Sequence, residues 1–417
     1  MENMDGIYIV GVGMTQFGKF PETAMKDLAR KAINDALTDA NCRKEAVEAA
    51  FFANATMGYM EGQTFIPGPI ALNYAGFEGI PMMTVENACG SGSTAMWLAI
   101  NFLRSGAGDV ALAVGAEKMN IPDKAKAMRV FDSGWELATA EEHFRHMMEV
   151  CGADVPEGTT GTGPRSYFMD VYAANARYQM THSGLTQYQM AVVSAKNHMN
   201  SVNNPRAAYR KAFTAEEIMA AKPVVYPLTV PMCAPLTDGG AAVIFCNEAG
   251  MKRYGFDRSR AVKVDACILR GATNHTYEES SARMADVLCA REAYDEAGMG
   301  PEDIDVAEVH DATSLGEISA VEHLGFCGCG EGGAFCESGE TALTGSIPIN
   351  PSGGLESKGH PLGATGPGQI FELVSQLRGE CGVRQVEGAR VALQQNGGGQ
   401  IKDDSASMVV TILSKCQ

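Results

Sequence analysis

The stretch TVENACGSGSTAMWLAI, residues 84–100, joins a predicted strand to a predicted helix, and the class of the fold follows from that junction. TVEN indicates the end of a buried strand, and GSGS is typical of the opening of a helix. Cys89 stands between them, where free backbone N–H groups and the helix dipole would favour its thiolate form. The glycines allow a backbone or a substrate to approach closely. A single buried cysteine is more often a small core residue, so a catalytic interpretation needs support from the rest of the chain.

The elements around this junction occur twice. The matching runs are 27–37 with 289–298, 48–56 with 306–314, 89–106 with 363–379, 109–119 with 389–399, and 241–248 with 407–414. The order of strand, helix, strand, glycine-rich turn, helix and strand predicts an α/β fold in which helices cover the faces of a sheet. Because several successive elements match in the same order, we expect two packed halves related by a pseudo-twofold axis.

The first half carries a long segment that the second half lacks. We expect an N-terminal half over residues 1–120 plus 225–255, an inserted loop domain over 121–224, and a C-terminal half over 256–417. An insertion of this size beside the edge of a sheet is often a functional loop, and here it would form a lid over the substrate.

Three motifs of the second half carry further chemistry, although each alone also fits a structural loop. NPSGGLESKGHPLGATG (350–366) places His360 in a glycine-rich turn that matches the position of Cys89, and an imidazole can take a thiol proton and return it. EVHDATS (308–314) places His310 after a strand, where it could bind a carbonyl oxygen directly or through a water. QNGGGQ (395–400) is predicted to be a turn that approaches the reacting group.

Taken in order and with their spacing, VENACGSGSTA, EVHDATS, NPSGGLESKGHPLGATG and QNGGG resemble the thiolase superfamily over nearly the whole chain. HDAT in place of an NEAF-type motif is most similar to the sterol-carrier-protein-type and archaeal-type thiolases, which are acetyl-CoA acetyltransferase-like. The overall resemblance also extends to a benzoylsuccinyl-CoA thiolase subunit. The resemblance implies a thiolase fold of five layers, αβαβα, with two pseudo-symmetric halves and an inserted loop domain.

The resemblance also implies roles for single residues. Cys89 would be the acylated nucleophile, His360 its base, and His310 a ligand of the thioester carbonyl. The glycine turn with Asn396 would supply Gly398, whose backbone amide would form an oxyanion hole with that of Cys89. The residues expected to support the loop around His360 are Asn350, Gly359 and Gly363.

The activity implied is a coenzyme A-dependent Claisen or retro-Claisen reaction of a 3-oxoacyl-CoA, with coenzyme A as a substrate and no permanently bound cofactor. A bulky or aromatic ester such as benzoylsuccinyl-CoA is one candidate substrate. One departure matters, because neither residues 395–397 (QNG) nor residues 310–313 (HDAT) hold the second cysteine of many thiolases. His310, His360 or a water would then handle the α-carbon proton. A decarboxylating ketosynthase and a non-catalytic acyl-CoA-binding subunit remain as alternatives.

The composition of the chain argues against several classes of binding partner and cellular location. The net charge of −17 and the lack of a basic stripe argue against nucleic-acid binding. No apolar stretch is long enough for a membrane span, the N-terminal run MENMDG is unlike a secretory signal, and the cysteines are scattered, so we expect a cytoplasmic protein. The resemblance implies a homodimer and a small partner subunit with a zinc ribbon and an OB-fold, which helps dock coenzyme A.

Several other residues are ambiguous. Cys327, Cys329 and Cys336 with His323 lack the paired spacings of a zinc site, so we interpret GFCGCGEGG (325–333) as a loop without a metal. His143 and His146 fit a helix surface better than a pocket lining. The methionine-rich runs at 57–62 and 146–150 fit a wide pocket as well as ordinary core.

Overall fold

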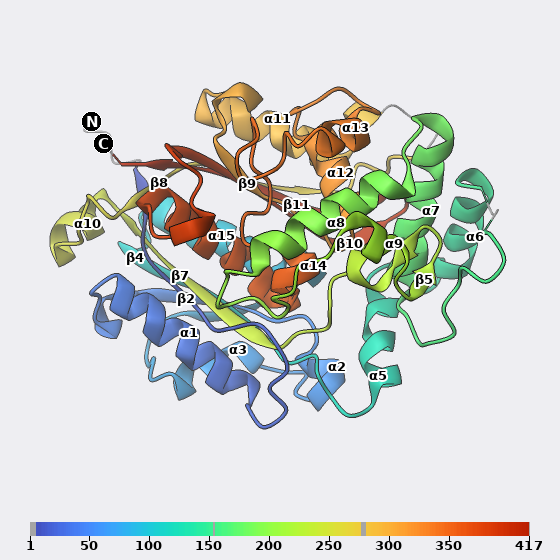
Figure 1. Cartoon of the computed structure of the whole chain (residues 1–417). Coiled ribbons are helices and arrows are strands. Elements are labelled where there is room, and N and C mark those ends of the chain that lie inside the picture. Colours follow the sequence, from blue (N-terminus) through green and yellow to red (C-terminus); the bar gives the residue numbers. More distant parts are fainter. Residues whose placement is uncertain (1–5, 153–154, 277–280, 417) are drawn as a thin grey trace.

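In the computed structural model, the described residues are 6–152, 155–276 and 281–416, so the first five residues of the predicted N-terminal half lie outside them. Nine strands form one mixed sheet in the order β3-β2-β4-β7-β1-β8-β11-β10-β9 (Figure 1). Their bounds are β1 Ile7–Met14, β2 Ala49–Ala53, β3 Met82–Val85, β4 Val110–Glu117, β7 Gly239–Asn247, β8 Val262–Gly271, β9 Val306–Glu308, β10 Val391–Ile401 and β11 Asp404–Lys415.

The order of pairing repeats from one half of the sheet to the other. From β1 outward, β7 and β4 follow in antiparallel pairs, and β2 and β3 follow in parallel pairs. From β8 outward, β11 and β10 follow in antiparallel pairs and β9 in a parallel pair, and Ala307 of β9 forms a parallel bridge to Ile349 where a counterpart of β3 would lie. The predicted duplication is therefore confirmed, and the halves join where β1 pairs with β8.

Helices form three layers around the two halves of the sheet (Figure 1). The helices α1 (Met25–Asp39) and α3 (Pro67–Tyr74) cover the outer face of the first half, and α11 (Ala285–Ala297) and α12 (Ser314–His323) cover that of the second. The helices α4 (Ser91–Arg104) and α15 (Leu362–Arg378) share the core between the two halves. This arrangement gives the five layers predicted from the sequence.

Close packing of glycines brings the beginnings of α4 and α15 together. A Cβ atom at Gly92 would lie 2.4 Å from the carbonyl oxygen of Gly363, and one at Gly115 of β4 would lie 1.7 Å from the same oxygen. Any larger residue at these two positions would push the helices apart. The small side chains therefore place the first turns of both central helices at one point.

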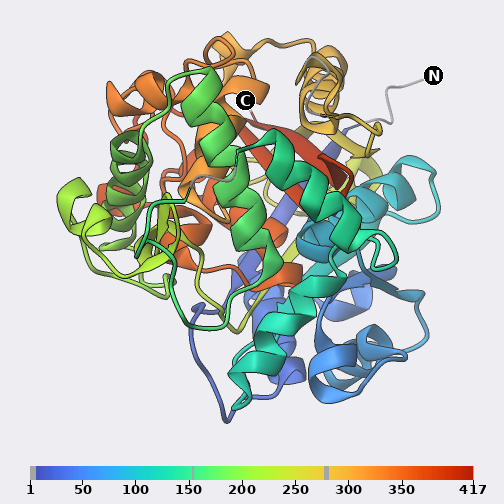
Figure 2. The same ribbon diagram turned by 90° about the vertical axis from the view of Figure 1, so that its right-hand side faces the viewer.

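The chain between β4 and β7 is mostly helical. Its helices are α5 Lys124–Arg129, α6 Ala140–Val150, α7 Tyr167–His182, α8 Gln187–Ser201 and α9 Ala215–Met219. Near its end, β5 (Pro223–Val225) and β6 (Leu228–Thr229) form a separate two-stranded sheet. Figure 2 shows these helices, in teal and green, across the face of the molecule that looks toward the viewer. The limits 121–224 for an inserted domain stay a prediction.

The remaining short helices are α2 Met57–Glu61, α10 Glu248–Tyr254, α13 Gly332–Glu337 and α14 Gly354–Lys358. Of all the helices in the described ranges, none combines the length and the apolar character that a bilayer-spanning helix needs.

Two local predictions were wrong. TVEN was expected to end a buried strand, but β3 is the edge strand, and Thr84 and Glu86 are exposed. QNGGGQ was expected to be a turn, but it lies within β10, where Gly397 pairs with Met408 and Gly398 with Ser407 of β11. Hydrogen bonding to β11 therefore outweighs the preference of the glycines for a turn, and only Gly399 takes a positive φ (65°).

Candidate active site

Cys89 lies in a strained turn at the beginning of a central helix. A short 3₁₀ turn, Ala88–Gly90, precedes α4, and Ala88 has a φ of 49°, which an alanine seldom adopts. The turn is held by Ser91, whose Oγ donates to the carbonyl of Ala88 (2.6 Å) and accepts from the N–H of Asn87 (2.8 Å). These bonds hold the backbone of the turn that carries Cys89.

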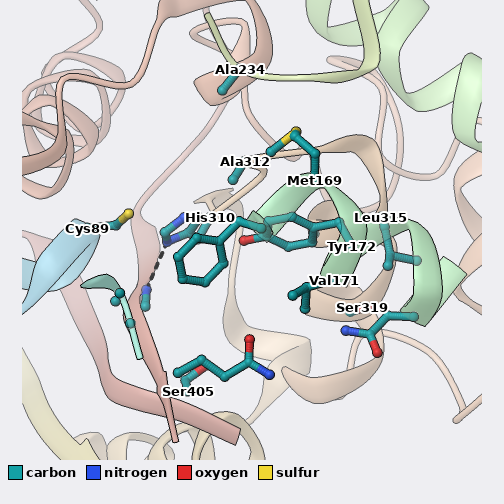
Figure 3. Close-up of a pocket in the computed structure, with 18 of the residues that line it drawn as sticks. Cys89, Met169, Val171, Tyr172, Ala234, His310, Ala312, Leu315, Ser319 and Ser405 are labelled. Atoms are coloured by element: carbon teal, nitrogen blue, oxygen red, sulfur yellow. Dashed lines mark hydrogen bonds between the residues drawn. The ribbon is translucent and has the colours of Figure 1, made fainter. Parts of the chain in front are cut away.

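The structure brings three of the predicted residues together. The Cys89 sulfur and one ring nitrogen each of His310 and His360 lie within 4.8 Å of one another. The two imidazole rings are 5.1 Å apart between centroids and inclined at 67°. Figure 3 shows the Cys89 side chain pointing toward His310. We refer to these three side chains as the reacting trio.

The hydrogen bonds of His310 show which of its ring nitrogens carries the proton. Its Nδ1 faces two donors, the N–H of Gly397 at 3.1 Å and the side-chain amide of Asn396 at 3.2 Å. The amide is oriented by Ser93, whose hydroxyl donates to Asn396 Oδ1 at 2.8 Å. Nδ1 is therefore an acceptor, and the neutral ring carries its proton on Nε2. Within the described part of the chain, that buried Nε2 has no hydrogen-bond partner.

His360 has the opposite tautomer. Its Nδ1 lies 2.7 Å from Thr365 Oγ1, and the Thr365 hydroxyl donates its own proton to the carbonyl of Pro361 (3.1 Å). Nδ1 must therefore be the donor, and Nε2 holds a lone pair. This Nε2 is also buried, and none of the described residues forms a hydrogen bond with it. The cleft thus contains one imidazole that donates and one that accepts.

Burial controls the charges of the reacting trio. Burial lowers the pKa of His310 to about 4, and burial with the neighbouring His310 holds the pKa of His360 well below its ordinary value. Burial, with the Glu117 carboxylate, raises the pKa of the Cys89 thiol to about 12. The expected preference for thiolate was wrong, because desolvation outweighs the backbone hydrogen bond that favours the anion. The three side chains of the reacting trio are therefore uncharged at rest, and a base must take the thiol proton.

A large cavity opens onto the reacting trio. Its volume is about 850 Å³, and all three residues line it. Most of its other walls come from α7, α12, β10 and the segments before β7. Its apolar lining includes Phe168, Met169, Tyr172 and Leu315 on the two helices, Phe131 just after α5, and Met408 on β11. Sequence reasoning missed these residues. The methionine-rich runs do not contribute, because Met60 and Met147 are buried in local cores instead.

One sulfur and two imidazoles are also a donor set for a metal such as zinc. Here the tautomers argue against it, because His310 Nε2 carries the proton and cannot serve as a ligand unless the ring changes tautomer. Cys327, Cys329, Cys336 and His323 do not gather into a comparable group among the described residues. His143 pairs with Asp403 at 3.1 Å and lies outside the cavity lining.

Two family models together cover most of the chain. The model described as "Thiolase, N-terminal domain" matches residues 7–249, and "Thiolase C-terminal domain-like" matches residues 272–415. The chain belongs to the thiolase family. As predicted, it is an enzyme of the thiolase acyltransferase class, and the family assignment rests on both halves of the chain.

Similar thiolases include proteins of the predicted types. The acetyl-CoA acetyltransferase of Methanothermobacter thermautotrophicus is 38% identical over 95% of this chain and 97% of that protein. Sterol carrier protein 2 of Oryctolagus cuniculus is 36% identical, with 94% of this chain and 70% of that protein covered. The benzoylsuccinyl-CoA thiolase subunit BbsB of Thauera aromatica is 32% identical over 94% of each chain.

Solved structures share the thiolase fold at low sequence identity. The "Ltp2-ChsH2(DUF35) aldolase" superposes with a TM-score of 0.74 at 18% identity and covers 99% of this chain and 98% of that one. Human mitochondrial 3-ketoacyl-CoA thiolase in complex with CoA gives a TM-score of 0.71 at 16% identity, with 99% and 98% covered.

The turn of Cys89 in this thiolase is packed directly against β10. A Cβ atom at Gly398 would lie 2.1 Å from the Asn87 carbonyl oxygen and 2.3 Å from the Gly90 nitrogen. Gln395, at one position where many thiolases have a cysteine, accepts the N–H of His310 at 2.8 Å through Oε1. Strand β10 therefore positions the cysteine turn and His310 together.

The predicted support residues shape the loop before His360. Gly359 has a φ of 114°, and a Cβ atom there would meet Thr237 at 2.9 Å, so the turn requires glycine. Asn350 has a φ of 54°, accepts from the N–H of Val309 (2.9 Å), and donates to Glu317 (2.9 Å). Asn350 thus ties this loop to the chain just before His310.

Glu117, which the sequence analysis missed, joins both halves beneath the trio. Its buried carboxylate accepts backbone N–H bonds from Thr56 (2.9 Å), Ala55 (3.1 Å) and Gly363 (2.9 Å). Burial raises the pKa of Glu117. The Glu117 carboxylate holds the N-terminus of α15 against the end of β2. In the sequence, GAEKM (115–119) shows only one acid beside a lysine in a strand-like run, which is a weak signal.

Proposed function

We propose that this thiolase cleaves a 3-oxoacyl-CoA with coenzyme A through an acyl group on Cys89. The observation that carries the proposal is the pair of opposite tautomers within 4.8 Å of the sulfur. The lone pair of His360 Nε2 suits a base for the thiol, and the Nε2–H of His310 suits a donor to an oxyanion. A thiol that is protonated at rest requires such a base.

The steps follow from these assignments. His360 takes the thiol proton while the Cys89 sulfur attacks the 3-keto carbon, and the backbone N–H groups of Cys89 and Gly398 receive the developing oxyanion. The bond between the α-carbon and the 3-carbon breaks, and His310 donates to the resulting thioester enolate. The enolate carbon takes the proton that His360 removed from the thiol, which gives the shortened CoA ester and returns His360 to its neutral form. Free coenzyme A then loses its thiol proton to His360 and attacks the acyl-cysteine, and His360 returns this proton to the departing Cys89 sulfur.

Local positive charge supports binding of coenzyme A. Tyr209 and Val230 line the cavity and are exposed, so they mark its rim. Arg210, Lys211 and Lys222 adjoin them and are exposed, in a chain whose net charge is −17. Phosphate groups would favour such a patch over the acidic surface elsewhere. The human 3-ketoacyl-CoA thiolase that shares the fold contains CoA.

The size and lining of the cavity support a bulky acyl group. A cavity of about 850 Å³ with Phe131, Phe168 and Tyr172 on its walls would hold an aromatic ring beside the reacting carbon. The relative from Thauera aromatica is named for benzoylsuccinyl-CoA. An aromatic or similarly bulky 3-oxoacyl-CoA is therefore the substrate that we infer.

Exposed apolar residues support a homodimer. The edge strand β3 exposes Met83 (37%), and the neighbouring loop exposes Phe65 (80%) and Ile66 (61%). Unpaired strand edges with apolar neighbours usually become covered. We infer that a second copy covers this edge. A small second subunit is also proposed, since one structural neighbour is titled "Ltp2-ChsH2(DUF35) aldolase" and one relative is named as a subunit.

A reducing compartment suits the cysteines. All twelve are free thiols in the structure, including the exposed Cys329. Thiols persist in the cytoplasm and are oxidised outside it. We infer a cytoplasmic enzyme on this basis.

Peptide mass mapping after mixing with aromatic and aliphatic 3-oxoacyl-CoA esters tests the function. We expect an acyl adduct on Cys89 that disappears when coenzyme A is added, with two CoA esters as products. The Cys89→Ala variant should show neither event. Carbon dioxide release from malonyl thioesters would instead indicate a decarboxylating ketosynthase. Ester binding without any adduct, with and without a partner subunit, would indicate a non-catalytic subunit.

A further inference from the structure

Beyond the reacting trio, the cavity runs between facing sides of α7 and α12 (Figure 3). The α12 residues that line it include Leu315, Ser319 and His323, which recur every four positions and so share one face. The α7 residues recur every three or four positions and include Phe168, Tyr172, Asn175, Gln179 and His182. The two helices are in contact, so these faces form opposite walls of one channel.

The walls change from apolar to polar with distance from His310. Figure 3 shows the labelled side chains leading from Cys89 and His310 past Tyr172 to Leu315 and Ser319. On α12, Ser319 and His323 lie about 7 Å and 13 Å along the helix axis from Ser314, which begins the helix shortly after His310. Gln179 meets Ser319 from the facing helix, and its amide donates to Ser319 Oγ at 3.2 Å.

His323 is held so that one ring nitrogen is available to a ligand. Its Nδ1 lies 3.4 Å from Asp286 Oδ2, and the Asp286 carboxylate also accepts bonds from Ser405 (3.1 Å) and Gln395 (3.4 Å). The His323 side chain is only 15% exposed. Its Nε2 forms no hydrogen bond to any described residue. A buried imidazole with one occupied nitrogen provides a hydrogen bond at the other.

The surrounding charge selects the kind of group that would fit. Burial lowers the pKa of His323, but the carboxylates of Asp286, Glu322 and Asp404 outweigh burial and raise it. These carboxylates come from α11, α12 and β11. Glu322 accepts bonds from Gly330 and Gly332, and Asp404 accepts one from Ala285, so both are already used. Because these three carboxylates surround a single imidazole, an anionic substituent on the substrate would be repelled here. An uncharged oxygen can accept or donate without that cost.

We propose that Gln179, Ser319 and His323 form a distal polar subsite for an uncharged hydroxyl or ketone oxygen on the acyl group of the substrate. This inference rests on the proposed function and narrows its substrate class. The substrate is a 3-oxoacyl-CoA with an apolar, ring-sized body that packs on Tyr172 and Leu315. Its distal oxygen reaches the α12 residues that follow Leu315 by one and two helical turns.

A matched pair of esters tests the subsite. The probes are 3-oxo-5-phenylpentanoyl-CoA and 3-oxo-5-(4-hydroxyphenyl)pentanoyl-CoA, which differ only in a distal hydroxyl. Calorimetry with the Cys89→Ala variant should give about tenfold tighter binding of the hydroxylated ester, the gain expected from one well-formed hydrogen bond. Added Ser319→Ala or Gln179→Leu should bring the two affinities to within about twofold, with binding of the phenyl ester unchanged.

Thr181→Val is the control, because Thr181 lies on α7 outside the cavity lining, and this variant should keep the preference. Equal binding of the two esters, or an equal loss for both in Ser319→Ala, would overturn the subsite. Failure of the proposed function would give a different result. The protein without substitutions would then form no acyl adduct on Cys89 with either ester. Binding to Cys89→Ala needs no turnover, so the two results are independent.

Discussion

The Asp311 carboxylate and the backbone N–H of Leu355 form a 2.7 Å hydrogen bond that ties the residue after His310 to the helix before His360. Asp311 also accepts the N–H of Glu356 at 3.3 Å, so it caps the first turn of α14. A Cβ atom at Gly354 would lie 2.1 Å from Asp311 Oδ2, which shows how closely this turn approaches. These contacts thus fix the segments that carry the two imidazoles relative to each other.

Replacing this cap should reduce the rate of acylation. In Asp311→Ala we expect kcat to fall by about 100-fold, because a small displacement of His360 relative to the thiol is costly. Asp311→Asn keeps one acceptor and should lose less. Asp305 provides the control, since it accepts backbone N–H bonds from Arg390 and Val391 away from the cleft. Asp305→Asn should change the melting temperature without changing kcat. If kcat fell as much in Asp305→Asn as in Asp311→Asn, the positioning role of Asp311 would be contradicted.

The protonation of Cys89 can be measured by alkylation. Because burial raises the pKa of this thiol to about 12, its reaction with iodoacetamide should accelerate steadily from pH 7 to pH 10 without a plateau. Peptide mapping measures Cys89 separately from the exposed Cys329, whose alkylation serves as a control for the reactivity of the reagent at each pH. A plateau beginning near pH 6 would instead reveal a resting thiolate–imidazolium pair.

Stability should depend on the protonation of His310. Its folded pKa is about 4 against roughly 6.5 when unfolded, so the unfolded chain binds more protons as the pH falls through this window. The free energy of unfolding should therefore drop by about 2 kcal/mol between pH 7.5 and pH 5 through this group alone. Urea titrations should therefore show a drop in the free energy of unfolding between pH 7.5 and pH 5 that is about 2 kcal/mol smaller in His310→Asn than in the unaltered protein. Parallel curves would contradict the buried neutral imidazole.

Because β10 packs directly against the Cys89 turn, replacing Gly398 should severely reduce acylation of Cys89. An added Cβ at Gly398 would lie 2.1 Å from the Asn87 oxygen, so Gly398→Ala must displace the turn or the strand. We expect acylation of Cys89 to fall by about 100-fold or more, measured by single-turnover mass spectrometry. Gly271→Ala in β8 is the matched control, and it should remain active. A Cβ atom at Gly271 would come no closer than 3.7 Å to its neighbours.

Sequence reasoning reached the reacting trio because each member stands in a local pattern that the chain repeats. Cys89 and His360 precede corresponding helices, and His310 follows a strand. The Asn396–Gly398 run was identified but assigned to a turn, since pairing with β11 is a long-range contact that glycine content does not reveal. The thiol pKa was wrong for a related reason, because desolvation depends on neighbours from the whole fold.

Residues that act through tertiary packing left little local trace. Tyr172 and Gln179 sit on a helix far along the chain from the motifs, and only the contact of α7 with α12 brings them to the cavity. Glu117 is one acid in a strand-like run until Gly363 is placed beside it. Periodicity predicts which face of such a helix is inward, but not what that face meets.

Cys89 belongs to the first repeat, whereas His310 and His360 both belong to the second. Neither repeat alone contains a nucleophile together with its base. Separating the two repeats would leave a thiol without a base in one and two imidazoles without a nucleophile in the other. Each half of the molecule is thus chemically incomplete, with a thiol side and an imidazole side that meet only when both halves are packed together.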